Sequence, residues 1–235
     1  MKNIKKTLAF TLAEIIFVMG IIGIVATLTI TNARKDTDVA EKVAQLRKTD
    51  EILSAAFAQA VAENGSMEHW GTNGGTPTDA QVWEVISPYL KLKKNCGNST
   101  GCWKTGKATK LTSSKDDVSE NIDGNSSINK GLLVNGASIA IDSHNQDNDY
   151  FGVMVDVNGP KQGTYRFGDD ILLFSVKKTS GEVSPFGYEY QNDFLDECIN
   201  GRGIYCTPWV MKFGNQDYLK PCRNELSWDG KHNCR

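Results

Sequence analysis

Carboxylate and amide side chains gather at two turns in the second half of this chain. Asp156 and Asn158 belong to an Asp-Val-Asn-Gly stretch, and Asp169 and Asp170 follow a glycine shortly afterwards. Calcium prefers hard oxygen donors of this kind, so a calcium site formed by these four residues is one hypothesis. No complete EF-hand loop is present. Aspartates in turns also accept hydrogen bonds from nearby backbone amides, so ordinary solvated turn residues are the alternative.

A second pattern could serve hydrolysis. Residues 97–101 read Gly-Asn-Ser-Thr-Gly and match the motif in which α/β-hydrolases present a nucleophilic serine. That geometry requires a buried strand before the serine and a helix after it. Ser99 instead lies among turn-forming residues between two cysteines. We therefore expect that the protein is not an enzyme and that it has no cofactor beyond the hypothetical calcium.

All six cysteines lie C-terminal to the apolar segment of residues 10–30: Cys96, Cys102, Cys198, Cys206, Cys222 and Cys234. An even number of cysteines in an oxidising compartment indicates disulfides. Of the many pairings that six cysteines allow, the short separations favour 96 with 102, 198 with 206 and 222 with 234. Zinc is the rival use, but no CxxC motif occurs and the three histidines are scattered.

The N-terminal segment predicts where the chain is delivered. From Phe10 to Ile30 the only ionisable side chain is Glu14. A helix of this length spans about 30 Å, the thickness of the hydrocarbon core of a bilayer. The leader, residues 1–9, carries three lysines, which favour a cytoplasmic N-terminus and place the rest of the chain outside. The apolar run is longer than that of an ordinary cleavable signal, and its small residue precedes it.

Residues 10–31, FTLAEIIFVMGIIGIVATLTIT, closely resemble the N-terminus of type IV pilins and of the pseudopilins of type II secretion systems. The resemblance implies that a prepilin peptidase cleaves after Ala9 and that Phe10 is then N-methylated. It also implies that Glu14 neutralises the terminal amine of a neighbouring subunit during filament assembly. Two positions depart from the family pattern. Ala9 stands where the family usually has Gly, and Thr31 where it often has Pro.

The two aspartate turns carry a shorter and less specific resemblance, to the turn pair in the sheet of major pseudopilins. Some members of that family bind calcium, which is the second source of the calcium hypothesis. The resemblance therefore implies the same site as the oxygen donors do.

Behind the apolar run, the sequence predicts an α+β, pilin-like fold. Apolar residues continue at helical spacing with no breaker before Gly65, so we expect one long transmembrane and amphipathic helix packed on a small antiparallel sheet. Thr78 or Asp79 can cap a short helix that ends near Pro88. The expected organisation is a leader (1–9), a transmembrane half-helix (10–31), an amphipathic half-helix (32–64) and a head (65–235) with an exposed loop (104–130), a sheet (131–177) and a disulfide-stapled C-terminal tail (185–235).

These observations favour a structural subunit of a type II secretion pseudopilus or type IV pilus-like filament. Its expected partners are other pilin-like subunits, the prepilin peptidase and an inner-membrane assembly platform. Its expected location is the inner membrane, with the N-terminus in the cytoplasm and the head outside, followed by an extracytoplasmic filament. The formal charge of −2 gives no basic footprint for nucleic acid. The alternatives are a membrane-tethered binding or adhesion protein that does not assemble, and an anchored hydrolase that depends on Ser99.

Overall fold

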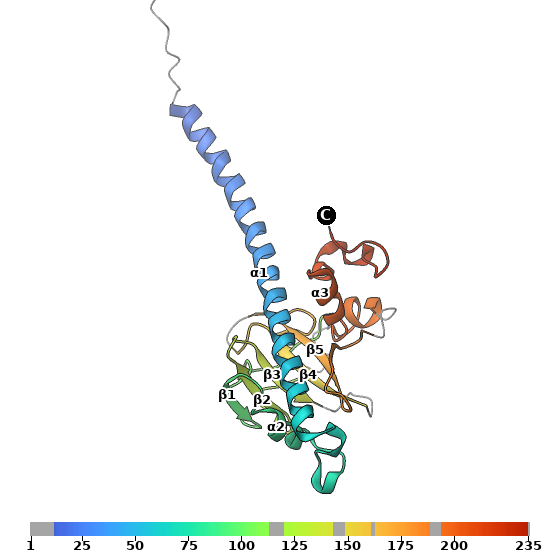
Figure 1. The fold of residues 1–235 in the computed structure, drawn as a ribbon. Helices are drawn as coiled ribbons and strands as arrows, with labels where there is room; N and C mark the ends of the chain where they lie inside the picture. The colour runs from blue at the N-terminus through green and yellow to red at the C-terminus, as the bar shows by residue number, and fades with distance from the viewer. Residues whose placement is uncertain (1–11, 113–119, 143–148, 161–162, 189–193, 235) are drawn as a thin grey trace, which may run out of the picture. The chain divides into compact units, whose positions relative to one another are not determined.

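The computed structural model describes residues 12–112, 120–142, 149–160, 163–188 and 194–234 (Figure 1). Within the first helix, the side chains of residues 23 and 25–36 are not described. The predicted cleavage and methylation site, Ala9 and Phe10, lies outside the described residues. The chain divides into two compact units, residues 1–39 and 40–235, and each is considered by itself.

The first helix, α1, is continuous over Leu12–Asn64. It ends at Gly65, whose φ of 77° is a left-handed conformation that favours glycine and whose N–H bonds to the carbonyl of Val61. The prediction of an unbroken helix up to Gly65 is confirmed. Among the described residues, none of the helices combines the length and the apolar character that a membrane span requires.

In the second unit, α1 buries an apolar stripe. Val43, Leu46, Leu53 and Phe57 are each at most 6% exposed, and their spacing of three, seven and four residues places them on one helical face. Figure 1 shows this part of α1 lying in front of β3 and β4 of the sheet. The stripe therefore packs on one face of the sheet.

The sheet is an antiparallel meander in which each of six strands pairs with the next along the chain. The strands are β1 (Leu92–Gly97), β2 (Asn129–Leu133), β3 (Ser138–Asp142), β4 (Tyr150–Asp156), β5 (Ile171–Lys177) and β6 (Val183–Pro185). In the central register, Ile139 of β3 faces Val155 of β4, which in turn faces Leu172 of β5. An α+β fold with an antiparallel sheet is thus confirmed, although the predicted range 131–177 leaves out β1, β6 and the start of β2.

The other face of the sheet is covered by the segment predicted to be an exposed loop. Ala108, Ile122 and Ile128 are buried in one cluster with Trp103 and with Met154 of β4, and this cluster holds no residue of α1. Within residues 104–112 and 120–130, exposed and buried positions therefore alternate, and the segment is not exposed throughout. The sequence shows few apolar residues here, but those few all point into the core.

Lys130 is a charged residue of this segment that is buried. Its side chain is fully buried, and its ammonium donates to the carbonyl oxygens of Ile122, Asp123 and Asn125 at 3.3, 3.0 and 2.7 Å. Three backbone acceptors satisfy the three donors of a lysine, which allows the charge to be buried. A lysine in a polar segment was therefore no sign of exposure.

Short helices complete the head. The helix α2, Asp79–Ile86, begins at Thr78 with a capping box in which Gln81 bonds back to the cap residue, so the predicted cap is confirmed. In the tail, α3 spans Thr207–Phe213. Single turns of 3-10 or π-helix lie at Met67–His69, Thr72–Gly74, Phe194–Ile199, Asp217–Leu219 and Pro221–Glu225.

The disulfides are Cys96–Cys102, Cys198–Cys206 and Cys222–Cys234, the pairing that the short separations favour. The first lies at the end of β1, and the other two lie in the tail. Each closes a short loop, so the bonds fix local turns rather than joining distant parts of the chain.

Candidate functional site

The turn that precedes β5 is the centre of the candidate site. The backbone N–H groups of Asp169, Asp170 and Ile171 all bond to the carbonyl of Arg166, which folds the turn tightly. Gly168 has a φ of 75°, and a Cβ there would lie 2.9 Å from the sulfur of Cys206. Only glycine combines that backbone angle with that close approach.

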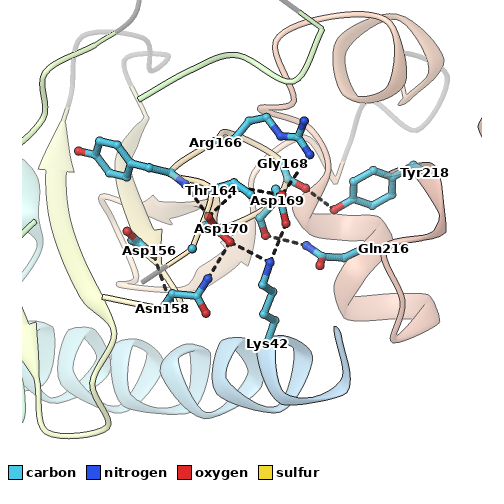
Figure 2. A network of polar contacts seen from close by, with 12 residues as sticks. Lys42, Asp156, Asn158, Thr164, Arg166, Gly168, Asp169, Asp170, Gln216 and Tyr218 are labelled. Atoms are coloured by element: carbon cyan, nitrogen blue, oxygen red, sulfur yellow. Dashed lines mark hydrogen bonds and ion pairs between the residues drawn. The ribbon is translucent and has the colours of Figure 1, made fainter. Parts of the chain in front are cut away.

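Lys42 of α1 reaches this turn. Its ammonium lies 2.7 Å from Oδ1 of Asp169 and 2.8 Å from Oδ1 of Asp170, as Figure 2 shows. The side chains of Lys42, Asp169 and Asp170 are 9%, 7% and 0% exposed. The long helix is thus joined to the sheet by a buried ion pair with two carboxylates.

The oxygens of the two carboxylates also have donors other than Lys42. The amide of Asn158 donates to Oδ1 of Asp170 at 2.7 Å, and the backbone N–H of Tyr165 donates to its Oδ2 at 2.6 Å. The hydroxyl of Thr164 lies 2.8 Å from Oδ2 of both aspartates. Arg166 contacts Oδ2 of Asp169 at 3.1 Å. A buried charge pair is stable only when its other polar atoms are satisfied in this way.

The electrostatics keep the ion pair charged. Burial acts to lower the pKa of Lys42, but its hydrogen bonds and charge interactions with Asp169 and Asp170 outweigh burial and leave that pKa raised. Burial likewise acts to raise the pKa of Asp169, but Lys42, with smaller contributions from Thr164 and Arg166, outweighs burial and leaves that pKa lowered. Each partner therefore stabilises the charged form of the other.

The C-terminal tail binds the back of the same turn. The side-chain amide of Gln216 donates to the carbonyl of Asp169 at 2.7 Å, and the hydroxyl of Tyr218 donates to the carbonyl of Gly168 at 2.7 Å. Both side chains are buried. One short turn thus joins α1, the Asn158 turn and the disulfide-stapled tail, which makes it a structural hub.

Asp156 is chemically different from the other two aspartates. Its Oδ1 accepts a hydrogen bond from the backbone N–H of Asn158 at 3.0 Å, whereas its fully buried Oδ2 has no hydrogen-bond partner among the described residues. In the strand register, it faces Ser138 and Ile171. Burial, with a further contribution from the negative charge of Asp170, raises the pKa of Asp156 to about 8. This carboxyl is therefore mostly protonated at pH 7.

The structure brings together three of the four residues of the calcium hypothesis, Asn158, Asp169 and Asp170, while Asp156 is linked to them only through Asn158. The described part of the chain holds no group of three or more His, Cys, Asp or Glu residues arranged to bind a metal. The residues do not fit a calcium ion beside Lys42, because the ammonium lies between the two carboxylates and their oxygens already accept hydrogen bonds.

The other predicted residues lie elsewhere. Glu14 is the acidic residue in the first turn of α1. Ser99 is exposed in the turn after β1, where its N–H bonds to the carbonyl of Cys96, and no helix begins there. The strand β1 ends at Gly97, two residues before Ser99, but its residues are exposed or half-buried. The buried strand and the following helix that flank a nucleophilic serine are therefore not formed around Ser99.

Sequence reasoning missed Lys42, Gln216 and Tyr218. The signal for Lys42 was its position, because it precedes Val43 and lies one turn before Leu46 on the buried stripe of α1. A charged residue on the buried face of an amphipathic helix calls for a buried partner of opposite charge. No such periodic signal marks Gln216 or Tyr218.

No protein-family model, curated protein or solved structure matched this chain.

Proposed function

We propose that this protein is a structural subunit of a type II secretion pseudopilus or a type IV pilus-like filament. In this proposal the fold is pilin-like, and the N-terminal half of α1 is held in the inner membrane before assembly. The head projects outside the cytoplasm. The partners are other pilin-like subunits, a prepilin peptidase and an inner-membrane assembly platform.

The observation that carries the proposal is the surface of α1 in the first unit. Apolar side chains at consecutive positions are exposed on all sides of the helix, with Leu12, Phe17 and Met19 at 77%, 70% and 70%. Apolar surface in water is unfavourable by about 25 cal/mol per Å², so a run of this kind favours burial in lipid or against other helices. Filament assembly supplies both environments in turn.

The second unit supports the same proposal. There α1 carries the apolar stripe and Lys42 and is fixed to the sheet and to the turn before β5. A subunit that assembles through its N-terminal helix needs a firm attachment between that helix and its head. The disulfides favour an oxidising compartment for the head.

Glu14→Ala tests the proposal. The variant removes a carboxylate from an apolar helix, so membrane insertion should be at least as easy as in the wild type. We expect the variant to be inserted and cleaved but to form far fewer crosslinked oligomers, because the N-terminal amine of a neighbouring subunit loses its counter-charge. The measurement is chemical crosslinking of the membrane-bound protein, with the length of the ladder read on a denaturing gel.

Glu51→Ala is the matched control, since Glu51 is an exposed carboxylate on the same helix. It should give the wild-type ladder. Equal ladders from all three proteins would contradict assembly through Glu14. Absence of any ladder from the wild type would favour a membrane-tethered binding or adhesion protein instead.

A further inference from the structure

Asp169 and Asp170 form a buried dicarboxylate that requires a cation. Their Oδ2 atoms both lie 2.8 Å from the same hydroxyl, that of Thr164, so the two negative charges are neighbours. Their side chains are 7% and 0% exposed, and water therefore screens the repulsion little. Such a pair stays ionised only if a positive charge lies between the carboxylates.

Lys42 supplies that charge from within the chain. Its ammonium contacts one oxygen of each aspartate at 2.7 and 2.8 Å, so it occupies the position between the two carboxylates. Arg166 touches only Asp169, at 3.1 Å, and its side chain is 34% exposed. Lys42 is therefore the cation that the two carboxylates share.

We propose that the Lys42 ammonium is a built-in substitute for a divalent cation at this turn, so that the attachment of α1 to the head does not depend on external calcium. Without the lysine, two carboxylates and the side-chain amide of Asn158 would surround a space left by the ammonium. These are hard oxygen ligands of the kind that calcium selects, once the amide turns its oxygen inward. The wild-type chain carries a latent calcium site that its own lysine fills.

The proposal predicts an exchange of one cation for another. Lys42→Ala empties the position and should lower the melting temperature in chelator, because two buried carboxylates lose their counter-charge. Calcium should then restore a substantial part of the loss by binding the folded state alone. The wild type should melt at the same temperature in calcium and in chelator.

The experiment follows thermal unfolding of the full chain in detergent by circular dichroism, in calcium chloride or in EGTA. Lys48→Ala is the matched control, since Lys48 is an exposed lysine on the same helix, and it should behave as the wild type does. Adding Asp170→Asn to Lys42→Ala should abolish the gain in calcium, because it removes a ligand. Lys42→Gln keeps a polar side chain that is one atom shorter and uncharged, so it should also melt higher in calcium than in EGTA.

Three results would overturn the proposal. One is a calcium-dependent melting temperature in the wild type, because the site would then bind metal beside Lys42. Another is an equal melting temperature of the folded Lys42→Ala and Lys42→Gln variants in calcium and chelator. The last is failure of both variants to fold in calcium. Folding of these variants in calcium but not in EGTA would support it. None of these outcomes depends on filament assembly.

Discussion

Asp156→Asn is expected to stabilise the protein at neutral pH and to leave its stability nearly unchanged at pH 4. The Asp156 carboxyl is fully buried, one of its oxygens has no hydrogen-bond partner in the part of the chain that the structure describes, and its pKa is raised from 3.8 to about 8. Between these two values the unfolded chain is ionised while the folded chain holds its proton. The free energy of unfolding of the wild type therefore falls as the pH rises through this interval.

The size of the effect follows from that interval. Each pH unit between 3.8 and about 8 lowers the free energy of unfolding by about 1.4 kcal/mol. The free energy of unfolding therefore falls by about 4 kcal/mol at most between pH 4 and pH 7. This is an upper bound, because relaxation around a buried charge reduces its penalty. Asparagine does not titrate. It keeps the Oδ1 acceptor for the N–H of Asn158 and, like the protonated acid, carries a donor at the other position.

The assay is urea unfolding of the full chain in a mild detergent at pH 4 and pH 7, followed by tryptophan fluorescence. Asp229→Asn, at an exposed position, is the control and should leave the wild-type pH dependence unchanged. The gain from Asp156→Asn should grow steadily between the two pH values. A gain of equal size at both, or a loss at pH 7, would refute the reasoning that this carboxyl is buried and protonated.

Two further predictions concern the covalent state of the chain. Mass spectrometry of the protein extracted from membranes should find an N-terminus at Phe10 carrying one methyl group. The reason is that the small residue Ala9 separates the basic leader from the apolar helix. A chain that begins at Met1 would contradict this prediction. Peptide mapping without reductant should recover the three disulfide pairs with no free thiol. Reduction should lower the melting temperature, because a disulfide that closes a loop of about 15 residues stabilises the fold by about 3 kcal/mol and one that closes a shorter loop by less. Six free thiols in protein from its native membrane would contradict the oxidising compartment.

Periodicity and capping predicted α1 and α2 well, whereas α3 in the tail was not predicted. The stripe that includes Leu46 and Leu53 repeats at helical spacing, and Thr78 supplies a cap followed three residues later by Gln81. These signals are local, so the sequence contains them in full. The inner strands could be predicted for the same reason, since the run from Phe151 to Val155 is apolar and flanked by turn residues.

Edge strands and the second core could not be predicted in the same way. The strand β1 carries two lysines and an asparagine. These residues suit an exposed edge strand, but they interrupt the alternation of apolar and polar residues by which a strand is predicted. Most residues around Ile122 are polar, yet Ile122 itself is buried, because the segment covers the face of the sheet that α1 leaves open. Such covering depends on contacts between distant segments, which composition does not reveal.

The candidate site shows the same division. The turn residues Asn158, Asp169 and Asp170 could be found because acidic and amide side chains mark turns. Their cation comes from Lys42, which lies 127 residues earlier than Asp169 in the chain. An acidic turn paired with a distant lysine has the same local sequence as one that binds a metal, so the sequence alone left both calcium binding and ordinary turn residues open.

Electron microscopy of surface filaments labelled with antibody against the head tests whether this chain is a filament subunit. We expect purified filaments from cells that produce the wild type to carry the label along their length or at an end. The Glu14→Ala variant should remove the label while the protein remains in the membrane. Unlabelled filaments together with wild-type protein found only as membrane-bound monomers would contradict the proposal that this chain is a filament subunit.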